Sequence, residues 1–243
     1  TKVDKVVGDT DLKANEALTY LYDSGFDENT LSKLLSIGVL GLKKNRKLVP
    51  TRWSIVASVD TISKNLINDI KEFNFIDNYR LYIGNYFGNY YFIMLLPDIW
   101  GYEIFETFLP GSLWNFSGKI EAATDYEDYY GRKDYAKSTA GGYYLPRFKI
   151  LEYLNQIKRQ ASCLVVRFET PEYKVPLGVW VTGAATKIAL ENNFLEFNSL
   201  EDMLNYIKSE IMKKFNFDVN KFFENSKLIK KFKTQTKLRQ FQG

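Results

Sequence analysis

One segment of the sequence brings acidic and basic side chains together at short spacing. Asp125, Glu127 and Asp128 are followed closely by Arg132 and Lys133. Carboxylate oxygens are the ligands that a hard divalent metal prefers, and neighbouring cations suit a phosphate group. The three carboxylates are therefore candidate catalytic residues for an enzyme that acts on nucleic acid or on a nucleotide. The alternative is structural, because charges in a polar loop are usually solvated.

A second candidate site places a cation beside an indole ring. Arg52 precedes Trp53 and follows the basic surface turn Lys43–Lys47. A guanidinium next to an aromatic ring suits contact with phosphate and base, so both residues are candidates for nucleic-acid binding. The same chemistry adds three further cations to this set: Arg132, Lys133 and Arg159. The structural alternative, which carries equal weight, puts Trp53 in the core and Arg52 in an ion pair.

The C-terminal residues have the spacing of a clamp-binding peptide. Gln235, Leu238 and Phe241 form the pattern Gln-x-x-Leu-x-x-Phe. In a one-turn helix with three residues per turn, Leu238 and Phe241 fall on one side as a hydrophobic plug, while the Gln235 amide can enter a polar pocket. The pattern predicts binding to the sliding clamp (PCNA). Gln242 stands where such motifs carry a second aromatic residue, so we expect a weaker anchor. The alternative is a frayed terminal helix that matches by chance.

Composition excludes several kinds of site. The sequence has one cysteine, Cys163, and no histidine, so it cannot form a disulfide framework or a zinc site of the usual Cys/His kind. The usual hydrolytic triads require histidine and are excluded as well. No glycine-rich nucleotide-binding loop is present. Any metal bound by this chain is expected to be a divalent ion with oxygen ligands.

Charge is concentrated at the C-terminal end of the chain. Residues 221–243 contain seven basic residues and one acid, so they carry +6, whereas residues 1–220 carry −2. We therefore expect a body, residues 1–220, followed by a basic tail, residues 221–243, that contains the clamp-binding motif. Because phosphate attraction grows with each exposed cation, nucleic-acid affinity must come from a local patch or from the tail.

The hydropathy pattern predicts a cytoplasmic protein with no membrane contact. The longest apolar run, Tyr90–Leu96, is far shorter than the roughly 20 residues that a membrane helix needs. No segment with the pattern of a secretory signal opens the chain.

The elements that position these residues form an α+β pattern. Apolar residues at helical spacing predict helices at Ala14–Tyr22, Thr30–Ile37 (capped by Asp27), Thr61–Phe73, Tyr143–Gln160 and Leu200–Phe215. Alternating or continuous apolar runs predict strands at Trp53–Ala57, Tyr79–Tyr86, Tyr90–Pro97, Gly101–Phe108, Cys163–Phe168 and Val175–Thr182. The aperiodic segment Thr124–Lys137 is expected to be a loop. The order predicts a mixed, mainly antiparallel sheet with flanking helices in a single integrated domain. The alternative is a division into two domains near Gly141.

Several blocks of the sequence together resemble the archaeal Nre family. They lie in order along nearly the whole chain: Asp9–Ala14, Leu48–Ile55, Pro110–Trp114, Asp125–Ala136, Gly141–Tyr144, Arg159–Ala161, Pro171–Tyr173 and Pro176–Trp180. The resemblance implies a protein linked to DNA-damage repair, with the sliding clamp (PCNA) as a partner. We expect the body of such a protein to bind DNA or another repair protein. The resemblance also implies a C-terminal clamp-interacting motif like the one that begins at Gln235.

The resemblance has two departures. Members of the family are longer on the N-terminal side, where a cysteine-rich segment resembles a zinc ribbon, so this chain is expected to correspond to their C-terminal two-thirds. In addition, Lys158-Arg159-Gln160 stands where the family has Arg-Arg-Gln. This change keeps the charge but loses one guanidinium that can bind bidentately.

Overall fold

The computed structural model describes residues 1–139 and 141–240, with side chains through Thr234. The chain divides into two compact units, Thr1–Asp69 and Ile70–Gly243, where the sequence predicted one integrated domain. The first unit is helical, and its buried residues include Leu18, Leu21 and Leu31. The second unit contains the sheet and its own core. Within residues 1–139 and 141–240, no helix combines the length and the apolar character needed to cross a bilayer.

The first unit is built from short helices and most of one long helix. Its elements are α1 (Lys2–Gly8), α2 (Ala14–Asp23), α3 (Glu28–Ser36), a 3-10 turn at Lys43–Asn45 and most of α4 (Thr51–Lys71). The sequence predicted α2 and α3, and the structure confirms both. The Asp27 carboxylate accepts hydrogen bonds from the backbone N–H groups of Asn29 and Thr30 at 2.9 and 3.0 Å, as expected for the cap of a helix N-terminus.

The strand predicted at Trp53–Ala57 is wrong, because these residues belong to α4. The buried stripe of this part of the helix contains two serines, Ser54 and Ser58, beside Ile55 and Val59. The serine hydroxyls bond to backbone carbonyls of the preceding turn, Ser54 to Thr51 and Ser58 to Ser54, both at 2.8 Å. Polar residues therefore occupy some of the buried positions of this helix, so its helical period cannot be recognised from apolar residues alone.

The second unit contains a six-stranded sheet with the order β4-β3-β5-β2-β1-β6. Its strands are β1 (Tyr79–Tyr86), β2 (Asn89–Leu96), β3 (Gly101–Phe108), β4 (Glu121–Glu127), β5 (Ser162–Glu169) and β6 (Leu195–Phe197). All neighbouring pairs are antiparallel except β3 and β5, which are parallel. The structure thus confirms a mixed, mainly antiparallel sheet in an α+β fold.

Three predictions for this unit need correction. Thr124–Lys137 is not all loop, since β4 extends to Glu127; as an edge strand its inward positions carry Asp125 and Glu127, so it has no apolar alternation. The predicted strand Val175–Thr182 is a loop followed by a helix. Gly178 has φ 71°, and the alternating Val175 and Leu177 are exposed. The helix predicted to reach Gln160 ends at Gln156.

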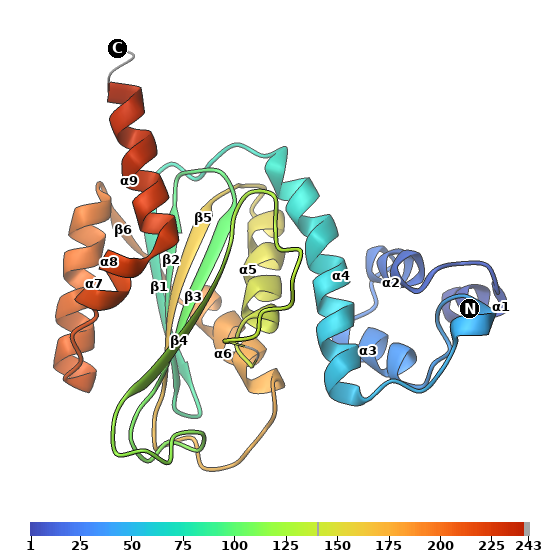
Figure 1. Ribbon diagram of the computed structural model, residues 1–243. Helices are drawn as coiled ribbons and strands as arrows, with labels where there is room; N and C mark the ends of the chain where they lie inside the picture. The colour runs from blue at the N-terminus through green and yellow to red at the C-terminus, as the bar shows by residue number, and fades with distance from the viewer. Residues whose placement is uncertain (140, 241–243) are drawn as a thin grey trace. The chain divides into compact units, whose positions relative to one another are not determined.

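Helices cover both faces of the sheet (Figure 1). One face packs against α5 (Tyr144–Gln156) and α6 (Trp180–Glu191). The opposite face packs against α7 (Leu200–Phe215), α8 (Asn220–Asn225) and the start of α9 (Lys227–Gln240). Because strand side chains alternate between faces, each strand contributes to two separate interiors.

The residues after 220 are partly built into the second unit. Phe223, Leu228 and Ile229 are buried in the core between the sheet and α7. The Glu103 carboxylate, on β3, accepts hydrogen bonds from the Ser226 hydroxyl at 2.5 Å and from the Leu228 N–H at 3.0 Å. A buried carboxylate of the sheet therefore caps the N-terminus of α9 and fixes where that helix begins.

Candidate functional site

Buried ion pairs gather on the sheet face that α5 and α6 cover. The strand register brings the charged residues of these ion pairs together. Glu106 of β3 stands beside Arg167 of β5 in the parallel pair, and Glu169 stands beside Asn89 of β2. On the edge strand β4, Asp125 stands beside Ile104 of β3. The charged residues are therefore spread along this face, from Glu127 beside Tyr102 near the start of β3 to Glu169 beside Phe108 at its end, with apolar residues between them.

The first centre is the carboxylate of Glu127. It accepts hydrogen bonds from the Arg147 guanidinium at 2.7 Å, the Tyr143 hydroxyl at 2.9 Å and the Trp100 indole N–H at 3.1 Å. The side chains of Arg147 and Glu127 are 2% and 0% exposed. Arg147 lies off the apolar stripe expected for its helix, yet it points into the sheet, because Glu127 compensates its charge.

The second centre is Asp125, which organises the loop after β4. One carboxylate oxygen accepts from the backbone N–H groups of Ser138 and Thr139 at 3.0 and 2.8 Å, and from the Thr139 hydroxyl at 2.9 Å. The other oxygen lies 3.0 Å from the Arg132 guanidinium. Arg132 also donates to the backbone carbonyl of Tyr126 at 3.0 Å. Asp125 and Arg132 therefore hold the loop that leads to α5.

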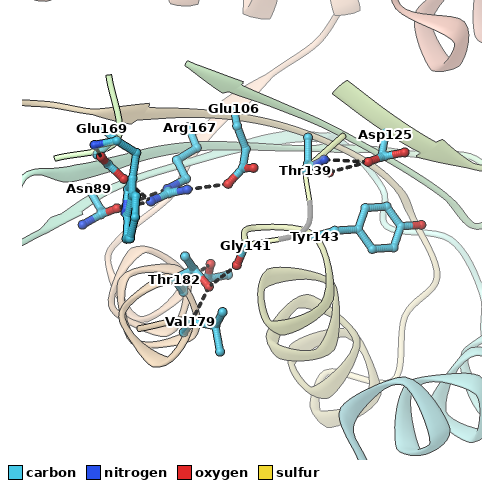
Figure 2. A network of polar contacts seen from close by, with 12 residues as sticks. Asn89, Glu106, Asp125, Thr139, Gly141, Tyr143, Arg167, Glu169, Val179 and Thr182 are labelled. Carbon is cyan, nitrogen blue, oxygen red and sulfur yellow. Dashed lines mark hydrogen bonds and ion pairs between the residues drawn. The ribbon is translucent and has the colours of Figure 1, made fainter. Parts of the chain in front are cut away.

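The third centre is Arg167, which Figure 2 shows between its partners. Its guanidinium donates to the carboxylate of Glu106, to the Glu169 carboxylate at 3.0 Å and to the Asn89 amide oxygen at 2.5 Å. Burial raises the pKa of the Glu106 carboxyl above its ordinary value of 4.5, against the opposing effect of Arg167. Burial likewise raises the pKa of Glu169. Two buried carboxyls thus share one buried cation.

The glycine-rich turn before α5 passes directly against Glu106. A Cβ atom on Gly142 would overlap the Glu106 carboxylate and would lie 2.6 Å from its Cδ. Beside it, the Thr182 hydroxyl of α6 approaches the Gly141 carbonyl at 3.4 Å. The buried Tyr91 hydroxyl, within the described part of the chain, makes no hydrogen bond of standard geometry. Only glycine leaves room for the backbone to pass at position 142.

The sequence of this chain matches two models of one protein family. The N-terminal model of archaeal Nre proteins matches residues 1–115, and the C-terminal model matches residues 127–241. The chain belongs to the archaeal Nre family. The family expected from the sequence blocks is thereby confirmed.

The sequences of curated relatives support the same family assignment. The Nre chain is 41% identical to the DNA repair protein NreB of Archaeoglobus fulgidus over 234 residues, which are 96% of this chain and 58% of the relative. It is 37% identical to the DNA repair protein NreA of Haloferax volcanii over 202 residues, 82% of this chain and 48% of the relative. The chain thus spans about half the length of these relatives. No solved structure matches it.

The Nre chain brings some of the sequence-predicted site residues together and leaves others apart. Asp125, Glu127 and Arg132 lie in the buried centres. Asp128 instead accepts a hydrogen bond from the Tyr130 N–H at 2.9 Å in a turn, and Lys133 is exposed. No group of three or more acidic, Cys or His side chains suited to a metal ion occurs in the described part of the chain.

The remaining predicted residues lie elsewhere. Trp53 is not in the core, since it is 52% exposed, and the Arg52 guanidinium lies 5.5 Å from its ring centroid. Arg159 is half-buried and donates to the backbone carbonyl of Lys158 at 3.0 Å. Of the predicted clamp-binding residues, the side chains of Gln235 and Leu238 and all of Phe241 lie outside the described residues.

The sequence prediction missed Glu106, Arg167 and Glu169. A signal for them was present, because each is a charged residue within a strand in which apolar and aromatic residues predominate. Such residues are rarely buried unless they are paired. Two adjacent strands with opposite charges therefore indicate a buried pair, although the register that joins them is set only in the folded sheet.

Proposed function

We propose that this chain is part of a DNA-damage repair factor that the sliding clamp (PCNA) recruits through the peptide Gln235–Phe241. The body would then contact DNA or another repair protein. The repair role is supported by 41% and 37% identity to proteins named DNA repair protein NreB and NreA. Clamp recruitment is supported by the Gln-x-x-Leu-x-x-Phe spacing and by how α9 is held.

The anchoring of α9 is the observation that carries the recruitment proposal. Glu103 caps the helix, and Leu228 and Ile229 are buried in the core, so the first turn is fixed to the sheet. The next turn carries the exposed cations Lys230 and Lys233. The backbone of residues 235–240 continues α9. A terminal peptide that extends such a fixed helix loses less freedom on binding than one on a long flexible linker.

The alternative proposal is a carboxylate- or metal-dependent enzyme acting on nucleic acid or a nucleotide. Its candidate residues Asp125 and Glu127 each hold an arginine, Arg132 and Arg147, together with backbone or side-chain donors. Carboxylates saturated in this way would have to break buried pairs before they could bind a metal or move a proton. The geometry therefore favours a structural role for this network over a catalytic one.

Calorimetric titration of the cognate sliding clamp tests the recruitment proposal. We expect micromolar binding by the unmodified chain and no binding by a Leu238→Ala/Phe241→Ala variant. The matched control, Thr236→Ala/Gln240→Ala, changes two residues that the spacing leaves unspecified and should bind like the unmodified chain. Absence of binding by the unmodified chain, or full binding by the Leu238/Phe241 variant, would overturn the proposal.

A further inference from the structure

One stretch of the first unit is free of acidic residues. Residues 29–59 contain six Lys and Arg residues and no Asp or Glu, so they carry +6. Because residues 1–220 carry −2, the rest of the body carries −8. The small net charge of residues 1–220 therefore conceals two large opposite charges. The body is acidic with one strongly positive segment, and such a segment attracts phosphates locally.

Five of these six cations are available at the surface. The exposed side chains are Lys33, Lys43, Lys44, Lys47 and Arg52. The sixth, Arg46, is held inside the unit, where it donates to the backbone carbonyls of Val7, Asp9 and Gly41 at 2.7–2.8 Å. Across residues 1–139 and 141–234, no carboxylate lies within ion-pair distance of the five exposed cations. Their charge is therefore not neutralised by the protein.

Large apolar side chains are exposed within the same segment. Trp53 is 52% exposed, Leu48 is 79% exposed and Ile37 is 58% exposed. The N–H of Val49 donates to the Ser36 carbonyl at 2.9 Å, and the Ser36 hydroxyl donates to the Val49 carbonyl at 2.8 Å. These bonds hold the backbone around Leu48 alongside that around Ile37.

The surface also contains a hollow large enough for a planar group. It has a volume of about 330 Å³, and its lining includes Lys13, Lys47, Leu35 and Val49. A hollow lined by aliphatic side chains and two cations suits a flat ring that carries a phosphate, since the ring contacts the apolar wall and the phosphate contacts the lysines.

We infer that this segment of the first unit binds single-stranded DNA. The lysines and Arg52 contact phosphates, and a base stacks on the half-exposed indole of Trp53, which Arg52 already covers in part. An unpaired base exposes its face for stacking, whereas the bases of a duplex are stacked on one another, so the aromatic ring favours the single strand. The site is separate from the C-terminal peptide and does not depend on clamp binding.

Fluorescence anisotropy with a labelled oligothymidylate of about 16 nucleotides, long enough for one binding site, tests this inference without the clamp. Trp53→Ala is expected to weaken binding at least about fivefold, since one base–aromatic stack is lost. Trp53→Phe should restore most of the affinity. The matched control is Trp114→Ala in the second unit, where the indole is 58% exposed and binding should not change.

A second pair of variants tests the charges. Lys43→Glu/Lys44→Glu should lower the affinity and reduce the salt dependence of log K by about 1.4, which is about 0.7 for each phosphate contact on a single strand. Lys174→Glu/Lys213→Glu makes the same change of net charge at exposed lysines of the second unit and should leave binding nearly unchanged. Circular dichroism checks that each variant is folded.

Three outcomes would overturn the inference. They are no binding by the unmodified chain, equal effects of the test and control variants, and duplex DNA bound as tightly as the single strand with no effect of Trp53→Ala. A negative result here with a positive clamp titration would remove the DNA site and leave recruitment standing. The reverse pattern would remove recruitment and leave the DNA site standing.

Discussion

The Arg147 guanidinium of α5 and the Glu127 carboxylate of β4 lie 2.7 Å apart, with both side chains almost fully enclosed. This pair joins the edge strand to the helix that covers it. Arg147→Met is expected to lower the free energy of unfolding by about 3–5 kcal/mol, because it leaves a buried carboxylate without its cation. Denaturant unfolding measures the loss.

An exposed ion pair serves as the control for this prediction. Lys187 and Glu191 on α6 lie 3.8 Å apart with side chains 64% and 62% exposed. Lys187→Met should therefore cost less than about 1 kcal/mol. Adding Glu127→Gln to Arg147→Met should recover part of the loss, since the unpaired charge is gone. A loss from Arg147→Met as small as that from Lys187→Met would contradict the prediction.

Gly142 and its neighbour Gly141 are expected to respond differently to alanine. A Cβ on Gly142 would overlap the Glu106 carboxylate, whereas a Cβ on Gly141 meets nothing within 4 Å. Glu106 is buried and paired with Arg167, so it cannot easily move away. Gly142→Ala should therefore cost about 1–3 kcal/mol of stability, and Gly141→Ala should cost nothing or stabilise by about 0.5 kcal/mol. Thermal unfolding of the two variants compares them directly.

The raised pKa of Glu106 predicts a pH dependence of stability. A carboxyl that is harder to ionise in the folded state binds more protons there than in the unfolded chain. Stability must then fall as pH rises from about the ordinary pKa of 4.5 toward the raised one, by at most about 1.4 kcal/mol per pH unit. Glu106→Gln should flatten this slope. Glu224→Gln, at an exposed position, should leave it unchanged, and equal slopes for all three proteins would contradict the prediction.

Local pattern was enough to predict the centre of the fold. β1, β2, β3 and β5 are long and rich in apolar and aromatic residues, so their period and turns mark them clearly. The first part of α4 was not predictable in the same way, because Ser54 and Ser58 occupy buried positions that an apolar pattern cannot detect. In the Val175–Leu177 loop the opposite holds, since apolar residues alternate there without being buried.

The candidate site was predictable only in part, for a reason of register. Asp125, Glu127 and Arg132 are close in the sequence and were identified as candidates. The residues that pair with Glu127 and Asp125 are farther along the chain, since Arg147 lies on α5 and Thr139 lies in the loop before it. Only the folded structure brings them together. Strand pairing decides which charges meet, and sequence spacing alone does not fix strand pairing.

Glu103 gives a test of how α9 is attached. Its carboxylate accepts from the Lys227 N–H at 3.1 Å and the Leu228 N–H at 3.0 Å, in a buried setting. Glu103→Ala should lower stability by about 1–3 kcal/mol, because buried N–H groups lose their acceptor. Hydrogen exchange should then accelerate in the first turn of α9. The amides of α5, on the opposite face of the sheet, should exchange no faster than the loss of global stability explains. Uniform acceleration in both helices would argue against a local cap.

The recruitment proposal predicts that a second aromatic residue in the C-terminal motif would tighten clamp binding. Gln242 stands where clamp-binding peptides carry a second ring, so Gln242→Phe should add buried apolar surface at the clamp. Burying most of a phenylalanine side chain contributes about 1.5 kcal/mol or more, which corresponds to a roughly tenfold lower Kd. Gln240→Phe adds the same ring at a position that the motif does not use, and it should leave the Kd unchanged. Equal tightening by both variants would mean that the ring acts through general hydrophobicity, and the motif would then not be the clamp-binding element.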